Sequence, residues 1–178
     1  MCSPFGPRGG NAHPGRAIAG FIRECAAAIP AAVRERSNLW VRVDSAGYQH
    51  DVFRAAEALG AVFTVTAPQH SSIRDAVRVL AADADTVWTA ALNAEAERGS
   101  EIAETVIEIG NTTKNRRLLR LIVRRQRTRA GDQLSFDDLN GWRFHAVVTN
   151  IPALFGPAEM VEAHHRLRAA SPKTPSAS

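Results

Sequence analysis

The aspartate at position 44 is the residue whose sequence context best suits it to chemistry. Asp44 follows a short apolar run, residues 39–43, and opens a polar turn at residues 45–47. The run predicts a buried strand, and open α/β sheets place ligands and active sites at the carboxyl ends of such strands. A carboxylate there can bind Mg²⁺ or Mn²⁺, which prefer oxygen ligands. On position alone, an Asx turn or a helix cap is the more frequent role for such an aspartate.

The histidines and cysteines form no metal-binding pattern in the sequence. His164 and His165 are adjacent on an expected helix, where neighbouring side chains point about 100° apart, so they do not form the i, i+4 pair of a zinc helix. The two cysteines, Cys2 and Cys25, give neither a ligand spacing nor a disulfide framework. We also find no glycine-rich phosphate loop and no nucleophile elbow, which disfavours an unrelated small α/β hydrolase.

An arginine-rich segment at residues 116–129 is the second candidate site. Seven arginines fall within it, in a chain of formal net charge +4. A clustered basic stripe attracts phosphate backbones. Equally, such a run can be a solvated strand face or can protect a sheet edge.

The spacing of apolar residues predicts the helices and strands that position these candidate residues. Residues 14–29 show apolar side chains at three- and four-residue steps, typical of a helix, with Pro30 at its end. A strand at 39–43, a helix ending at Gly60 and a strand at 61–66 follow. Strand, helix and strand in so few residues predict a βαβ unit with parallel strands.

The pattern changes beyond residue 70. A short helix is expected after Ser71, followed by antiparallel strands at 102–109, 118–127 and 142–149, and a last helix at 158–168. The fold class is therefore α/β. We divide the chain into a core part at 1–70, a β-rich part at 71–152, a C-terminal helical part at 153–170, and a tail at 171–178 whose composition predicts disorder.

The composition also bears on the cellular setting. No segment approaches the ~20 apolar residues that a membrane span requires, and the first ten residues lack the apolar stretch of a signal peptide. We therefore expect a cytoplasmic protein without a membrane partner.

Two segments together resemble a known family. They are residues 39–48, which end in Asp44-Ser45-Ala46-Gly47-Tyr48, and residues 161–168 of the last helix. Both resemble the DDE transposases of bacterial insertion sequences, in the branch called transposase DDE domain group 1. Residues 8–12 look like the exit of that family's third sheet strand, and residues 142–149 look like the strand that leaves its insertion.

The resemblance implies a ribonuclease H-like core with a β-rich insertion before the last catalytic helix. It implies that Asp44 is the second of three metal-binding carboxylates, and that an intact relative holds two Mg²⁺ ions for DNA cleavage and strand transfer. The partner would be DNA at the ends of the insertion sequence. We expect DNA contacts from arginines of the stripe and from the last helix, namely Arg117, Arg120, Arg124, Arg125, Arg127 and Arg168.

The sequence departs from the family pattern at both ends. The strand with the first catalytic aspartate, and its two neighbours, should precede Arg8. The family's glutamate should follow Arg168 by four or five residues, where Pro172 and Lys173 stand, and no acidic residue follows Glu162. With two carboxylates missing, we expect a transposase fragment that is inactive alone, has an uncovered sheet edge and self-associates. The alternative is a non-catalytic DNA-binding fragment that uses the arginines at 116–129.

Overall fold

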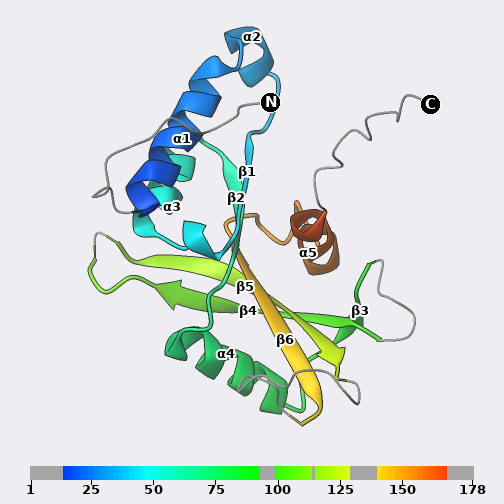
Figure 1. The fold of residues 1–178 in the computed structure, drawn as a ribbon. Helices are drawn as coiled ribbons and strands as arrows, with labels where there is room; N and C mark the ends of the chain where they lie inside the picture. Colours follow the sequence, from blue (N-terminus) through cyan, green and yellow to red (C-terminus); the bar gives the residue numbers. More distant parts are fainter. Residues whose placement is uncertain (1–13, 93–98, 114, 129–139, 168–178) are drawn as a thin grey trace, which may run out of the picture.

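The computed structural model describes residues 14–92, 99–113, 115–128 and 140–167. Within them, six strands form one mixed sheet in the order β1-β2-β6-β5-β4-β3 (Figure 1). The strands are β1 (Trp40–Val43), β2 (Val62–Thr66), β3 (Thr89–Ala90), β4 (Glu101–Ile109), β5 (Arg117–Arg127) and β6 (Trp142–Thr149). The helices are α1 (Pro14–Ala28), α2 (Ala31–Arg34), α3 (His50–Ala58), α4 (Ser71–Ala82) and α5 (Ala158–Arg166), with a 3₁₀ turn η1 (Ser45–Gly47). The α/β class is confirmed.

The β1–α3–β2 segment forms the expected parallel unit. Trp40 pairs with Val62 and Val43 with Val65, in a continuous parallel register. The chain after β1 first makes the η1 turn, so α3 begins at His50 rather than directly after the polar turn. Gly60 ends the helix with a φ of +64°, a conformation that glycine adopts without steric cost.

The remaining strands are antiparallel and belong to the same sheet. β6 pairs with β2 on one side, where Thr64 lies opposite Thr149, and with β5 on the other. β4 pairs with β5 along its full length, from Glu101 to Ile109. The core part and the β-rich part of the sequence are therefore joined by continuous strand pairing across the boundary expected at residue 70.

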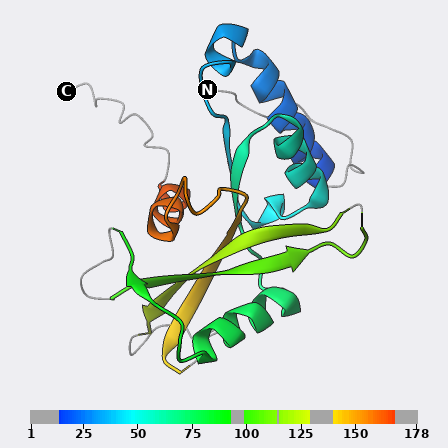
Figure 2. The same ribbon diagram turned by 180° about the vertical axis from the view of Figure 1, so that it is seen from behind.

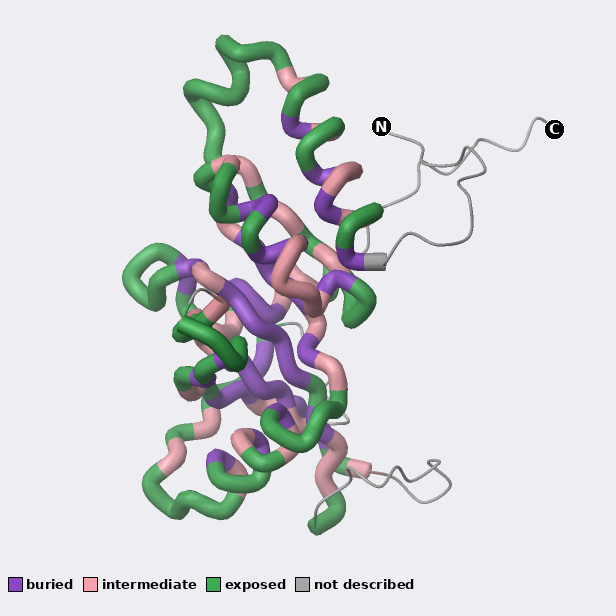
Figure 3. Tube along the Cα trace, turned by 90° about the vertical axis from the view of Figure 1, so that its left-hand side faces the viewer, coloured by how far each residue is buried: buried purple, intermediate pink, exposed green. Residues whose placement is uncertain are grey.

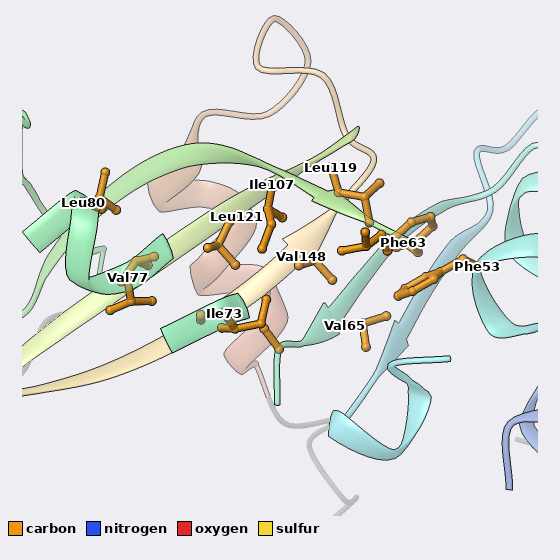
Figure 4. Close-up of a cluster of buried hydrophobic side chains, with 14 of the residues drawn as sticks. Phe53, Phe63, Val65, Ile73, Val77, Leu80, Ile107, Leu119, Leu121 and Val148 are labelled. Atoms are coloured by element: carbon orange, nitrogen blue, oxygen red, sulfur yellow. The ribbon is translucent and has the colours of Figure 1, made fainter. Parts of the chain in front are cut away.

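Helices cover both faces of this sheet. On one face, α3 and α4 pack on β2, β4, β5 and β6 around the core of Figure 4. Helix α5 lies on the other face (Figure 2). Its Val161 packs with Ile102 and Ile122. Helix α1 lies outside α3 and beside β1, and its Ala19 and Ile22 pack on Val52. Because each fully buried apolar side chain contributes about 1.5–3 kcal/mol, these clusters hold the strands in register.

Burial is concentrated in the middle of the sheet, where β2, β5 and β6 lie (Figure 3). In β1, by contrast, exposed and half-buried residues alternate. In the described part of the chain, no helix is long and apolar enough to cross a membrane. Residues 8–12, Arg129, Arg168, Pro172, Lys173 and the tail at 171–178 lie outside the described residues.

Candidate functional site

Asp44 lies directly after β1, at the carboxyl end of the parallel pair. Its backbone is extended, and its Oδ1 accepts a hydrogen bond from the Ala46 N–H at 3.0 Å, which caps η1. The side chain is exposed. The capping role and an outward-facing carboxylate therefore occur together at this residue.

Gly47 explains why a glycine follows this aspartate by three residues. It is buried against the side chain of Val43, and a Cβ at position 47 would stand 2.6 Å from the Val43 Cβ and overlap its Cγ1. Next to it, Tyr48 packs edge-on against Phe53, with ring centroids 5.6 Å apart. Burial raises the pKa of the Tyr48 hydroxyl. The turn is thus anchored to the core on one side while Asp44 faces outward on the other.

Asp44 borders a cavity of about 1100 Å³ that follows the outer edge of β1. Helix α1 forms one wall with apolar side chains, including Ile18 and Phe21, and Ile29 extends the wall just after the helix. The polar end of the cavity is formed by Asp44, Arg42, Thr66 and the end of α5. A carboxylate, a hydroxyl and a guanidinium thus border the same space.

Helix α5 reaches this site through His165. Its Nε2 lies 2.9 Å from the Thr66 Oγ1, and its Nδ1 lies 2.9 Å from the Thr64 Oγ1. Burial, followed by the charges of Arg42 and His164, lowers the pKa of His165 to about 4. The ring is therefore neutral at pH 7, with one nitrogen donating and the other accepting.

Two further contacts tie α5 to β1. The His164 ring stacks on Trp40, with centroids 3.9 Å apart. The Arg42 Nη1 donates to the carbonyl oxygens of His164 and His165 at 3.3 and 3.4 Å. A guanidinium suits this place because the last carbonyls of a helix lack partners and carry partial negative charge. The sequence reasoning missed these contacts, and only the adjacent histidines drew attention to the helix.

Few side chains that could bind a metal ion lie around Asp44 among the described residues. Glu162, also on α5, does not border the cavity; its Oε1 lies 2.5 Å from the Arg166 Nε and 3.9 Å from the Arg124 Nε. Within residues 14–92, 99–113, 115–128 and 140–167, no three His, Cys, Asp or Glu side chains gather to hold a metal ion. The site offers one carboxylate, and both nitrogens of the nearby imidazole of His165 are already hydrogen-bonded.

The expected DNA-contact arginines on β5 face partners inside the protein. Arg117 makes two hydrogen bonds to the Glu57 carboxylate, at 2.7 and 2.9 Å. Arg120 bonds to Glu104 and donates to the carbonyl oxygens of Ile151 and Gly156 at 2.7 and 2.9 Å. Both guanidinium-bearing side chains are only 12% exposed. Their charges are matched within the fold.

The other members of the set differ in exposure. Arg124 is buried and donates to the Ser100 Oγ at 2.8 Å. Arg125 bonds to Glu101 at 2.7 Å, and its guanidinium lies between the rings of Trp88 and Trp142, 3.9 and 4.5 Å from their centroids. Arg127 is exposed and lies over Trp142 at 4.1 Å. Of the five described arginines in the set, Arg127 is the one whose side chain is exposed at the surface.

Comparison with protein-family models and with curated proteins finds no match to this chain.

Proposed function

We propose that this chain is part of the ribonuclease H-like core of a DDE transposase, in which Asp44 is one of the metal-binding carboxylates. The observation that carries the proposal is the position of Asp44. It is an exposed carboxylate at the carboxyl end of a parallel strand in a βαβ unit, and it borders a cavity. Active sites of open α/β sheets occupy this place.

Two further features support the proposal. Gly47 fits the Asp-Ser-x-Gly pattern because the turn leaves no room for a Cβ. A β-rich segment separates the βαβ unit from the last helix, as in the resembling family. One feature departs from the family pattern: β1 is an edge strand in the described residues, whereas an aspartate-bearing strand of such a core would have a neighbour on both sides.

The described residues do not fit two metal ions. Two-metal phosphoryl transfer needs ions roughly 3.5–4 Å apart, held by shared carboxylates. Asp44 provides one carboxylate, and the other polar side chains described at this end of the cavity are a hydroxyl, a guanidinium and a hydrogen-bonded imidazole. We therefore propose that the chain alone does not cleave DNA and that any binding of a divalent ion at Asp44 is weak.

Manganese titration followed by nuclear magnetic resonance tests this proposal. We expect Mn²⁺ to broaden the backbone signals of residues 44–48 and 66 first, at millimolar concentration. Asp44→Asn should abolish that broadening, since asparagine keeps the cap but removes the charge. Asp83→Asn is a matched control, because the Asp83 Oδ1 also accepts from a backbone N–H two residues on, at 3.0 Å.

Two results would contradict the proposal. If Mn²⁺ affects Asp44 no more than Asp83, the aspartate is a turn residue only and the family assignment loses its main support. If the purified chain nicks supercoiled DNA with Mg²⁺ and Asp44→Asn abolishes this, the chain is active alone and a second set of ligands exists.

The alternative, a non-catalytic DNA-binding fragment, has weaker support. Arg117, Arg120 and Arg125 are hydrogen-bonded to carboxylates and Arg124 is buried. A guanidinium already paired in this way must give up its partner before it can neutralise a phosphate. In the described part of the stripe, Arg116 and Arg127 are exposed, and Arg116 is already paired with Glu108 at 2.8 Å. These two do not make a phosphate-binding stripe.

A further inference from the structure

The outer edge of β1 carries backbone groups without a strand partner. β1 is the end strand of the sheet, and in the described part of the chain no strand lies beyond it. The Leu39 carbonyl accepts from the Val62 N–H at 3.0 Å, so Leu39 faces β2. Because successive residues of a strand turn their N–H and C=O groups to opposite sides, Trp40 and Arg42 present theirs to the open edge.

An apolar wall stands beside this edge. Figure 1 shows α1 running alongside β1, and the cavity between them is lined by half-buried Ile18, Phe21 and Ile29. A short open edge next to an apolar wall is suited to accept one more strand, as in β-augmentation.

We infer that the occupant is the β1 strand of a second copy of this chain, paired antiparallel about a two-fold axis at Val41. In this register Trp40 lies opposite Arg42 of the second copy, and Arg42 lies opposite its Trp40. Both are pairs of the hydrogen-bonded type, and together they use all the outward N–H and C=O groups of both edges. No other antiparallel register of this strand with itself does so.

The side chains around the edge are self-complementary in that arrangement. The two-fold axis is perpendicular to the sheet, so both α1 helices lie on the same face and turn their apolar walls toward each other. On the opposite face, Trp40, which is 42% exposed and stacks on its own His164, lies next to the Arg42 side chain of the second copy.

Charge at the ends of the strand favours the same orientation. Asp44 follows β1, whereas the exposed segment before it contains Arg34, Glu35 and Arg36, a net positive charge. Antiparallel pairing brings Asp44 opposite Asn38 of the second copy and close to its Arg36. Parallel pairing would instead align Asp44 with Asp44 of the second copy, and like charges directly opposite are destabilising.

Such an interface is isologous and closes after two copies. The opposite end of the sheet is β3, a two-residue strand, Thr89–Ala90, which offers little for further pairing. The expected product is therefore a dimer with one continuous sheet rather than an open polymer.

Sedimentation equilibrium on the full chain, from micromolar to near-millimolar concentration, tests this inference. We expect a reversible monomer–dimer equilibrium. Arg42→Pro should shift it at least tenfold toward monomer, because proline removes an outward N–H and its ring blocks the edge. Arg42→Ala is the matched control: it also loses the side-chain contacts to α5 but keeps the N–H, and should still dimerise.

Cysteine cross-linking gives a second measurement, which does not require that the Arg42→Pro variant folds. In a variant with Cys2 and Cys25 replaced by serine, Val41→Cys should oxidise to a covalent dimer. Two copies of residue 41 face each other in a non-hydrogen-bonded pair, with Cα atoms about 4.5 Å apart, within disulfide range. Val43→Cys lies opposite Leu39 of the second copy and should not cross-link.

A wild-type chain that stays monomeric throughout, or that forms only open-ended aggregates, would overturn the inference. So would a dimer in which Val43→Cys cross-links as readily as Val41→Cys, since this would place the contact elsewhere or leave its register undefined.

Discussion

His165 on α5 and Thr66 on β2 are joined by a contact of 2.9 Å between Nε2 and Oγ1. The other ring nitrogen lies at the same distance from the Thr64 Oγ1, so the imidazole sits between two hydroxyls of one strand. Because α5 otherwise contacts the sheet through few apolar side chains, this histidine is a main determinant of how the helix docks beside Asp44.

The protonation of His165 should make the stability of the fold depend on pH. Its pKa is about 4 in the folded protein against an ordinary value of 6.5, so the unfolded chain binds more protons between these values. The stabilisation is complete above pH ~6.5 and is lost as the pH falls toward ~4, by at most about 3 kcal/mol. Urea unfolding at pH 7.5, 6, 5 and 4 measures it.

His165→Gln is the control for that measurement. Glutamine can hydrogen-bond to both threonines but does not titrate in this range. Its free energy of unfolding should fall less than that of the wild type between pH 6.5 and 4. If both proteins lose the same stability, another group is responsible for the acid sensitivity.

Arg120 should contribute to the stability of the fold rather than to DNA binding. Its guanidinium is 12% exposed and bonds to Glu104 and to the carbonyls of Ile151 and Gly156, which lie in the segment leading to α5. Arg120→Met leaves those oxygens without a donor, and we expect a loss of about 2–3 kcal/mol. Arg116→Met is the control, because Arg116 is 62% exposed and its pair with Glu108 is worth about 0.5 kcal/mol.

Thermal unfolding by circular dichroism compares the two variants. If Arg116→Met destabilises the protein as much as Arg120→Met, the loss reflects net charge and not the buried hydrogen bonds.

Five of the six described strands were predictable because their patterns are local, whereas β3, with only two residues, was not predicted. In β6, Phe144, Ala146 and Val148 share one face, and this two-residue period predicts a strand wherever it lies in the fold. The pairing of β6 with β2 was not predictable, because neither strand's pattern specifies its neighbour. The Thr149 Oγ1 donating to the Phe63 carbonyl is one contact that the sequence alone does not indicate.

The candidate sites also divide into features with a local sequence signal and features that depend on contacts between distant segments. Asp44 was predicted because a strand followed by a polar turn is a local signal, and its place in the βαβ unit is confirmed. The arginine stripe was ambiguous because a run of like charges does not show where its counter-ions are. Glu57, which neutralises Arg117, lies on α3, far from the stripe in sequence.

DNA binding by the described arginines should show a weak dependence on salt. Each phosphate neutralised contributes about 0.9 to the slope of log K against log salt concentration. With Arg116, Arg117, Arg120, Arg124 and Arg125 all within 4.0 Å of carboxylates, we expect the 116–127 part of the stripe to add about one contact or fewer. Fluorescence anisotropy with duplex DNA at several salt concentrations measures the slope.

A slope near five, reduced by about one in each Arg→Ala variant of that group, would contradict this prediction. It would restore the DNA-binding fragment as the better interpretation, with the ion pairs opening on contact with phosphate.

Two glycine substitutions test whether the turn after Asp44 is fixed by packing. Gly47→Ala places a methyl group against Val43, so the turn or the strand must shift, and we expect a loss of at least about 2 kcal/mol. Gly20→Ala on α1 meets no atom within 4 Å and should stabilise the helix by about 0.5–1 kcal/mol. Chemical denaturation of both variants gives the two values, and Mn²⁺ titration of Gly47→Ala should show a weakened effect at Asp44.

A Gly47→Ala protein as stable as Gly20→Ala would mean that η1 tolerates a side chain. The glycine would then be no argument for the Asp-Ser-x-Gly resemblance.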